Sequence, residues 1–146
     1  MEPAANQRRI KIVAAVIRDE CGRCLLVRKS GTSCFIQAGG KPEPGEAPLD
    51  TLEREIFEEL GCEIDRESAE FDGDYSAPAA NEVGAIVDAS IYRVTLKTHP
   101  VPNGEIDEIL WLNPNEPGSV LLAPLTEFDV LPRYKKWVKP TISRPL

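Results

Sequence analysis

The sequence predicts one layered α/β domain built around a mixed β-sheet. Short runs rich in β-branched residues alternate with turn signals, while one helical segment lies near the middle of the chain and another near its C-terminal end. A chain of 146 residues has the usual length of a single domain with its own core. Its 42% hydrophobic and 28% charged residues are typical of globular proteins. We expect the domain to span residues 9–138, with a loose segment at 1–8 and a tail at 139–146.

The N-terminal part contains three predicted strands. Residues 9–17 are rich in Ile, Val and Ala, which is typical of a buried strand, and residues 24–28 form a second apolar run. A turn signal at 19–22 separates these runs, so we expect a hairpin. Residues 35–38 form a short third strand. The glycines and prolines of residues 39–45 exclude regular structure and predict a long loop.

A central helix is predicted over residues 48–60. Pro48 suits its first turn, where the missing N–H costs nothing, and Gly61 suits a left-handed residue just after its end. Ala47 stands at the N-cap position, where it cannot accept the hydrogen bond that Ser, Thr or Asp would accept, a loss of typically about 1 kcal/mol. The start of this helix therefore needs another source of stabilisation.

The C-terminal part contains two further strands and a second helix. Residues 83–97 form a long β-branched stretch, and residues 109–112 form a short strand. The sequence Thr-Glu-Phe-Asp beginning at Thr126 is similar to a capping box. We therefore expect a helix from Thr126 towards Val138, bent at Pro132.

Composition and charge exclude several classes of protein. A net charge of −7 produces a field that repels phosphate, so duplex nucleic acid is not an expected partner. The longest apolar run, residues 12–17, is too short to cross a bilayer, and residues 1–11 lack the apolar stretch of a signal peptide. We expect a cytoplasmic protein without a membrane segment. Its cysteines should be reduced thiols; they are Cys21, Cys24, Cys34 and Cys62.

The central helix presents a crowded acidic face. At about 100° per residue, Glu55, Glu58 and Glu59 fall within an arc of about 100° beside the apolar stripe, and like charges so close destabilise a helix. One interpretation is a solvated face in which Arg54 and Glu58 form an i, i+4 pair. The other is an oxygen-only site for Mg²⁺ or Mn²⁺, which would relieve the repulsion. The apolar stripe consists of Leu49, Leu52, Ile56 and Leu60.

The segment from Gly40 to Cys62, GKPEPGEAPLDTLEREIFEELGC, resembles the signature of the Nudix (MutT-like) hydrolases. Cys62 departs mildly, since it replaces an aliphatic residue, but a match at eight specified positions is a specific signal. The resemblance implies an α/β/α sandwich with a mixed β-sheet and a loop–helix–loop catalytic motif. It also implies hydrolysis of the diphosphate bond of a nucleoside diphosphate linked to another moiety. The matching positions are Gly40, Glu46, Arg54, Glu55, Ile56, Glu58, Glu59 and Gly61.

The same resemblance implies a role for each matching residue. Glu58 and Glu59 are expected to bind Mg²⁺ or Mn²⁺ together with the backbone carbonyl of Gly39. Glu55 is expected to orient or deprotonate the attacking water, or to bind a further metal, and Arg54 to orient these carboxylates. We count Glu55, Glu59 and Arg54 as catalytic candidates. The structural positions of the motif are Gly40, Glu46 and Gly61, of which Glu46 would help to hold the poorly capped start of the helix.

Residues outside the motif extend the predicted site. Nudix hydrolases often add an acidic ligand just before a tryptophan late in the sheet, a place occupied here by Glu105 and, second, Glu108. Arg28 and Lys41 are candidates to bind substrate phosphates. The aromatic residues considered for stacking on a base are Trp111 and Tyr75.

The sequence leaves the substrate open. Pro78 lies 16 residues after Cys62, as in the branch of the family that cleaves ADP-ribose, whereas the short chain is similar to enzymes that hydrolyse nucleoside triphosphates. The substrate is therefore a nucleoside triphosphate or an ADP-ribose or nucleotide-sugar-like compound, and a homodimer is plausible. Two alternatives are a non-catalytic module that senses nucleotides and a zinc or redox site at Cys21 and Cys24.

Overall fold

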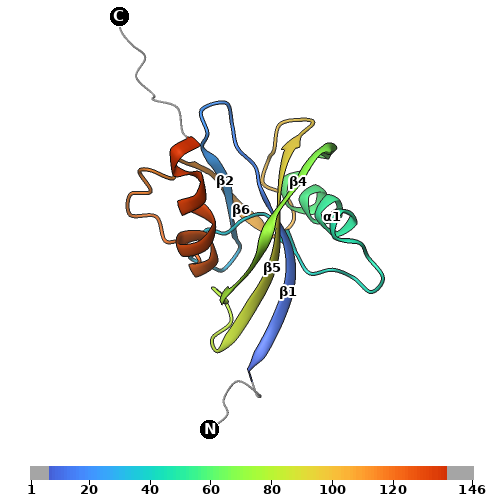
Figure 1. Cartoon of the computed structure of the whole chain (residues 1–146), viewed down its shortest axis with the longest axis vertical. Coiled ribbons are helices and arrows are strands. Elements are labelled where there is room, and N and C mark those ends of the chain that lie inside the picture. Colours follow the sequence, from blue (N-terminus) through green and yellow to red (C-terminus); the bar gives the residue numbers. More distant parts are fainter. Residues whose placement is uncertain (1–6, 138–146) are drawn as a thin grey trace, which may run out of the picture.

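The computed structural model describes residues 7–137 (Figure 1). In this part of the chain no helix is long and apolar enough to cross a membrane. The predicted tail at 139–146 and residues 1–6 lie outside the described residues. The strands are β1 (Arg8–Val16), β2 (Cys24–Lys29), β3 (Gly39–Gly40), β4 (Ile64–Pro78), β5 (Ala85–Leu96) and β6 (Ile106–Leu112). The helices are α1 (Pro48–Leu60), the π-helix η2 (Leu125–Val130) and the 3-10 helix η3 (Leu131–Trp137).

The strands form two sheets. The larger has the order β3-β1-β5-β4, in which β1 runs parallel to β5 and the other pairs are antiparallel. The smaller consists of β2 and β6 in antiparallel pairing. The mixed sheet expected from the sequence is confirmed.

Alternating side chains of β1 separate two hydrophobic cores. Val13 and Ala15 pack in the core that includes Leu52 and Ile56 of α1. Ala14 and Val16 pack in the core that includes η2 and η3. Because successive strand residues point to opposite faces, the helices cover both sides of the sheet. Figure 1 shows α1 on one side of the strands and the orange to red C-terminal helices on the other, which is the predicted α/β/α sandwich.

The predicted hairpin between the first two strands is wrong. Among the described residues, the contact between these segments is confined to the turn and its edges, where Arg18 pairs with Cys24 and the Leu25 N–H donates to the Ile17 carbonyl oxygen at 2.8 Å. From there β2 pairs with β6 instead. The side chains of β2 contribute to both cores, so this strand is covered on both faces and continues the layer beyond the larger sheet.

Strand boundaries differ most from the sequence prediction in two places. The third strand is β3, which pairs with β1, whereas Phe35 and Ile36 of the predicted strand make only isolated bridges. The second difference is β4, which was not predicted. This strand lies at the edge of the larger sheet, carries many charged residues and contains register shifts, so its sequence lacks an apolar alternation of period two.

The predicted capping box at Thr126 is also wrong. Pro124 occupies the N-cap position of η2, and Thr126 lies inside the helix with its side chain fully buried. The change from π-helix to 3-10 helix falls at Leu131, one residue before the bend predicted at Pro132. Proline has no N–H to continue the preceding hydrogen-bond ladder, which accounts for a change of helix type here. Val138 lies outside the described residues.

Candidate active site

Helix α1 begins and ends where the sequence predicts. Ala47 is the N-cap and makes no side-chain capping hydrogen bond, and Pro48 follows in the first turn. Gly61 ends the helix in the left-handed region, with φ of 66°, and its N–H donates to the Phe57 carbonyl oxygen at 3.0 Å. A side chain with a Cβ would be strained at this φ, so glycine suits this position.

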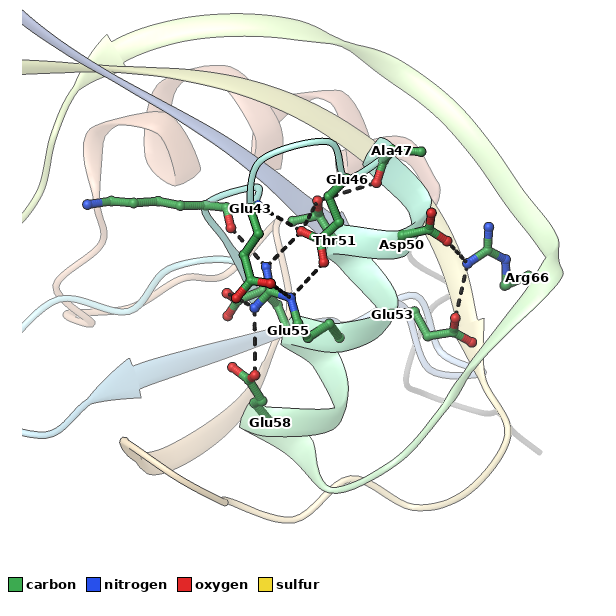
Figure 2. A network of polar contacts seen from close by, with 11 residues as sticks. Glu43, Glu46, Ala47, Asp50, Thr51, Glu53, Glu55, Glu58 and Arg66 are labelled. Carbon is green, nitrogen blue, oxygen red and sulfur yellow. Dashed lines mark hydrogen bonds and ion pairs between the residues drawn. The ribbon is translucent and has the colours of Figure 1, made fainter.

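Glu46 supplies the stabilisation that Ala47 lacks. Its Oε1 accepts hydrogen bonds from the Thr51 hydroxyl at 2.8 Å and from the Glu43 N–H at 2.9 Å. Arg54 donates to both oxygens of the same carboxylate, with Nε to Oε2 at 2.8 Å and Nη2 to Oε1 at 2.9 Å. These hydrogen bonds hold the pKa of Glu46 at about 2. The loop before α1 is therefore fastened to the first two turns of the helix (Figure 2).

Arg54 also connects the loop to the acidic face of the helix. Its Nη1 donates to Glu55 Oε2 at 2.9 Å and lies 3.6 Å from Glu58 Oε2, while Nη2 donates to the Lys41 carbonyl oxygen at 3.0 Å. Figure 2 shows Glu46, Glu55 and Glu58 converging around this guanidinium. The i, i+4 pair of the solvated-face interpretation is thus present, but as part of a larger network that includes Glu46 and Glu55.

The three predicted site carboxylates of α1 differ in burial. Glu59 is 7% exposed, whereas the side chains of Glu55 and Glu58 are 16% and 56% exposed. Burial raises the pKa of Glu59 to about 7, against the opposing effects of a hydrogen bond from the Gly39 N–H at 3.1 Å and the charge of Lys29. Burial also raises the pKa of Glu55, although Arg54 opposes it. Perturbed carboxylates of this kind are typical of functional sites.

Two glycines allow β3 to approach both β1 and these carboxylates. A Cβ on Gly40 would overlap the Glu55 carboxyl group, and a Cβ on Gly39 would overlap the Val13 carbonyl oxygen. Gly39 also adopts a φ of 150°, which residues with side chains rarely adopt. The structure thus gives a steric reason for glycine at both positions, and it brings the Gly39 N–H to Glu59.

A cavity of about 750 Å³ opens over this acidic face. That volume is in the range of small-molecule sites. Its lining contains Glu55, Glu58, Glu59, Gly39 and Gly40, and also the predicted residues Lys41 and Glu105. Other parts of the wall come from residues 79–82 and from the segment that includes η2. The cavity therefore extends from α1 past β3 towards the C-terminal helices.

The cation at the end of β2 that reaches the cavity is Lys29. Lys29 lines the cavity and its charge acts on both Glu55 and Glu59. Arg28, the residue predicted from the sequence, is not among the lining residues, since its Nε donates to Glu108 at 2.8 Å and its Nη1 to the Thr32 carbonyl oxygen at 2.8 Å. Neighbouring strand residues point to opposite faces, so the choice between them depended on strand orientation.

Other residues considered from the sequence lie away from the cavity. Glu108 pairs with Arg28, and of the two acidic candidates outside the motif only Glu105 is in the lining. Trp111 packs against the core on the α1 side. The ring of Tyr75 lies against the Arg133 guanidinium, 5.8 Å from its Cζ. Neither aromatic residue lines the cavity.

The donor chemistry of the acidic face fits a hard divalent cation. Among the described residues no three His, Cys, Asp or Glu side chains are already placed to hold a metal ion, and Arg54 pairs with Glu55 and contacts Glu58. The candidate ligands are nevertheless carboxylate oxygens, and the buried Glu59 carboxylate has a hydrogen bond at Oε1 from Gly39. A cation bound here would compete with Arg54 for Glu55 and Glu58.

The cysteine pair does not support the zinc or redox alternative. Cys24 is buried, and this burial raises the pKa of its thiol to about 12, so the thiolate needed for zinc binding or redox chemistry is disfavoured. Cys21 is exposed in the turn. All four cysteines are free, as the sequence predicts.

The fold and its acidic cavity define a class of enzymes in which a loop and a helix present carboxylates to a small phosphorylated compound. A family model described as the NUDIX domain matches residues 8–134. The chain belongs to the Nudix family and is a Nudix hydrolase. Members of this family act on small nucleotide substrates and generally use divalent metals.

Individual relatives agree with this family. The chain is 34% identical over 125 residues to the CTP pyrophosphohydrolase of Escherichia coli (strain K12), covering 79% of this chain and 84% of that relative. It is similar to the solution structure of the Escherichia coli ORF135 protein, with a TM-score of 0.63, 27% identity, and coverage of 84% of this chain and 86% of the other. A NUDIX hydrolase from Nitrosomonas europaea shares the fold, with a TM-score of 0.70, 21% identity, and coverage of 94% and 98%.

Proposed function

We propose that this enzyme hydrolyses a nucleoside triphosphate to a nucleoside monophosphate and pyrophosphate, with CTP as the leading substrate and Mg²⁺ or Mn²⁺ as cofactor. The observation that carries the proposal is the 34% identity to the CTP pyrophosphohydrolase, over 84% of that relative. The acidic face and two lysines in one cavity of about 750 Å³ support it. Pro78, which pointed to ADP-ribose, lies at the end of β4 and does not line the cavity.

The residues that would hold the metal are Glu55, Glu58 and Glu59, with the Gly39 carbonyl and Glu105 as further candidates. When bound, such a cation neutralises phosphate oxygens and lowers the pKa of a coordinated water. Glu55 is the residue to which we assign the proton of the attacking water, because its burial raises its pKa while Arg54 holds one of its oxygens in place.

The basic residues of the cavity bind the substrate in this proposal. Lys29 and Lys41 lie in the lining and carry the charge needed to contact phosphate oxygens. Arg54 acts through the carboxylates, since its guanidinium is occupied by Glu46 and Glu55. The homodimer and the cytoplasmic location stay predictions from the sequence.

A substrate panel tests this function. CTP, UTP, ATP, GTP and ADP-ribose are incubated with the full chain and Mg²⁺, and pyrophosphate and orthophosphate are measured separately. We expect CTP to yield equal amounts of CMP and pyrophosphate, with little orthophosphate. Saturable nucleotide binding without any product would favour the sensing module instead. Hydrolysis of ADP-ribose alone would move the substrate to the nucleotide-sugar class.

A further inference from the structure

A buried polar pair lies in the wall of the cavity. The Thr126 hydroxyl donates to Gln37 Oε1 at 2.8 Å, although the two residues are 89 positions apart in the sequence. Gln37 is 5% exposed and Thr126 is 0% exposed, and both line the cavity. Apolar side chains form the wall around them, among them Ile12, Val87 and Leu125. A polar pair kept in an apolar wall suggests recognition of a polar group.

The backbone brings these two residues together through a short parallel contact. The Phe35 N–H donates to the Leu121 carbonyl oxygen at 2.9 Å, and the Ala123 N–H donates to the Phe35 carbonyl oxygen at 3.1 Å. The chain then enters the π-helix η2, which contains Thr126. π-Helices are rare and occur frequently at functional sites.

The hydrogen bond from Thr126 determines what Gln37 offers to a ligand. With Oε1 occupied as an acceptor, the amide presents its two Nε2 hydrogens, for which the described part of the chain provides no acceptor. A buried donor without a partner is costly, whereas a ligand acceptor placed there would satisfy it. The cavity wall therefore presents a donor, held in orientation by Thr126, to a group that accepts hydrogen bonds.

The position of Gln37 relative to the acidic face suits the base of a nucleotide. Gln37 precedes Gly39 by two residues, so their Cα atoms are no more than about 7 Å apart. The Gly39 N–H in turn contacts Glu59. A ribose can bridge this distance, with its phosphates over the carboxylates and its base beside the Gln37 amide.

We propose that Gln37 selects the base, and that its Nε2 donates to the unprotonated N3 of cytosine, while Thr126 is a positioning residue that fixes the amide. This inference rests on the proposed function. Uracil carries an N–H at the corresponding ring position, so two donors would face each other in a cavity that has little water to separate them. CTP is then preferred over UTP by on the order of tenfold to a hundredfold, the effect of one unsatisfied buried donor.

Substitutions at Gln37 and Thr126 test this assignment through the ratio of kcat/KM for CTP to that for UTP. Gln37→Glu keeps the acceptor for the Thr126 hydroxyl but replaces the donor by an acceptor, so the preference for CTP should be lost or reversed. Gln37→Leu should reduce the ratio to near one. In both variants the change should fall mainly on KM, with kcat for CTP within about twofold.

Thr126 variants separate positioning from general structural damage. Thr126→Val removes the hydroxyl at nearly constant volume, which frees the amide to turn, and should lower the CTP to UTP ratio to a smaller extent than Gln37→Leu. Thr126→Ser retains the hydroxyl and should restore the wild-type ratio. A Thr126→Val enzyme with an unchanged ratio would overturn the positioning role.

The outcome for base selection can be distinguished from that for hydrolysis. If the wild-type enzyme hydrolyses triphosphates but the Gln37 variants keep its CTP to UTP ratio, base selection is wrong and the proposed function stands. If the wild-type enzyme hydrolyses none, the proposed function fails, and calorimetric titration with CMP and UMP makes the same comparison. Equal affinity of the wild type for both would then overturn base selection.

Discussion

The two sides of the cavity are assembled in different ways. On the side of α1, Glu46, Arg54 and Glu55 lie within nine consecutive positions on either side of Arg54, and their hydrogen bonds link a loop to the helix that follows it. On the side of η2, Gln37 and Thr126 come from segments 89 residues apart. The first side is a local structure, and the second depends on packing of the whole domain. We infer that the chemistry and the recognition of the base can be changed separately.

Glu59→Gln should have the largest effect on the α1 side. The amide keeps an acceptor for the Gly39 N–H but loses the charge, so Mg²⁺-dependent kcat should fall by on the order of 10²- to 10⁴-fold. The preference for CTP in binding should remain, because Gln37 and Thr126 are unchanged. Activity assays and nucleotide titration measure both quantities.

Glu53→Gln is the matched control for this variant. It makes the same substitution on the same helix, but Glu53 pairs with Arg66 and does not line the cavity. We expect near-wild-type activity from it. Full Mg²⁺-dependent hydrolysis by Glu59→Gln would contradict the assignment of Glu59.

The pH dependence of stability should show the buried Glu59 carboxyl next. Its pKa is about 7 in the fold, against 4.5 for the ordinary group, so the folded state binds more protons between these values and stability falls as pH rises through this window. For the metal-free protein the fall is about 3 kcal/mol by pH 8. Urea unfolding at several pH values measures it, and Glu59→Gln should remove this contribution. An equal pH dependence in that variant would point to other groups.

Metal binding should stabilise the folded protein by a similar or smaller amount. A cation that binds the folded carboxylates raises the free energy of unfolding by about 2.7 kcal/mol at a concentration of 100 Kd. Thermal unfolding with and without saturating Mg²⁺ or Mn²⁺ measures the effect, and Ca²⁺-free buffer with a chelator provides the baseline. A melting temperature that ignores both ions would count against a metal site on α1.

Asp72→Ala should affect the η2 side with the smallest energy. The Asp72 side chain is 4% exposed and accepts a hydrogen bond at 3.0 Å from Arg133 of η3. Its loss should cost about 1–3 kcal/mol in the free energy of unfolding. It should also raise KM for CTP more than it lowers kcat, because η3 continues directly from η2.

Glu70→Ala controls for that variant on the same strand. Glu70 pairs with Arg93 but its side chain is 67% exposed, so its removal should change stability little. A large fall in kcat with unchanged KM in Asp72→Ala would show that the two sides of the cavity are not separable.

Prediction from the sequence succeeded where structure is local. The bounds of α1 and the steric need for glycine at Gly61 follow from neighbouring residues alone. The prediction failed at β4, where one side of the strand is an open edge and bulges interrupt the alternation. It also failed at Thr126, whose hydroxyl bonds to Gln37 rather than capping its own helix.

The sequence by itself determined the spacing that places Glu55, Glu58 and Glu59 on one face of α1, because helical geometry depends only on residue number along the chain. The tertiary structure decided how deeply each carboxylate is buried, and it selected Lys29 rather than Arg28 to line the cavity. It also brought Gln37 to Thr126. These features depend on strand pairing and on packing between distant segments, which the spacing of residues within one segment does not specify.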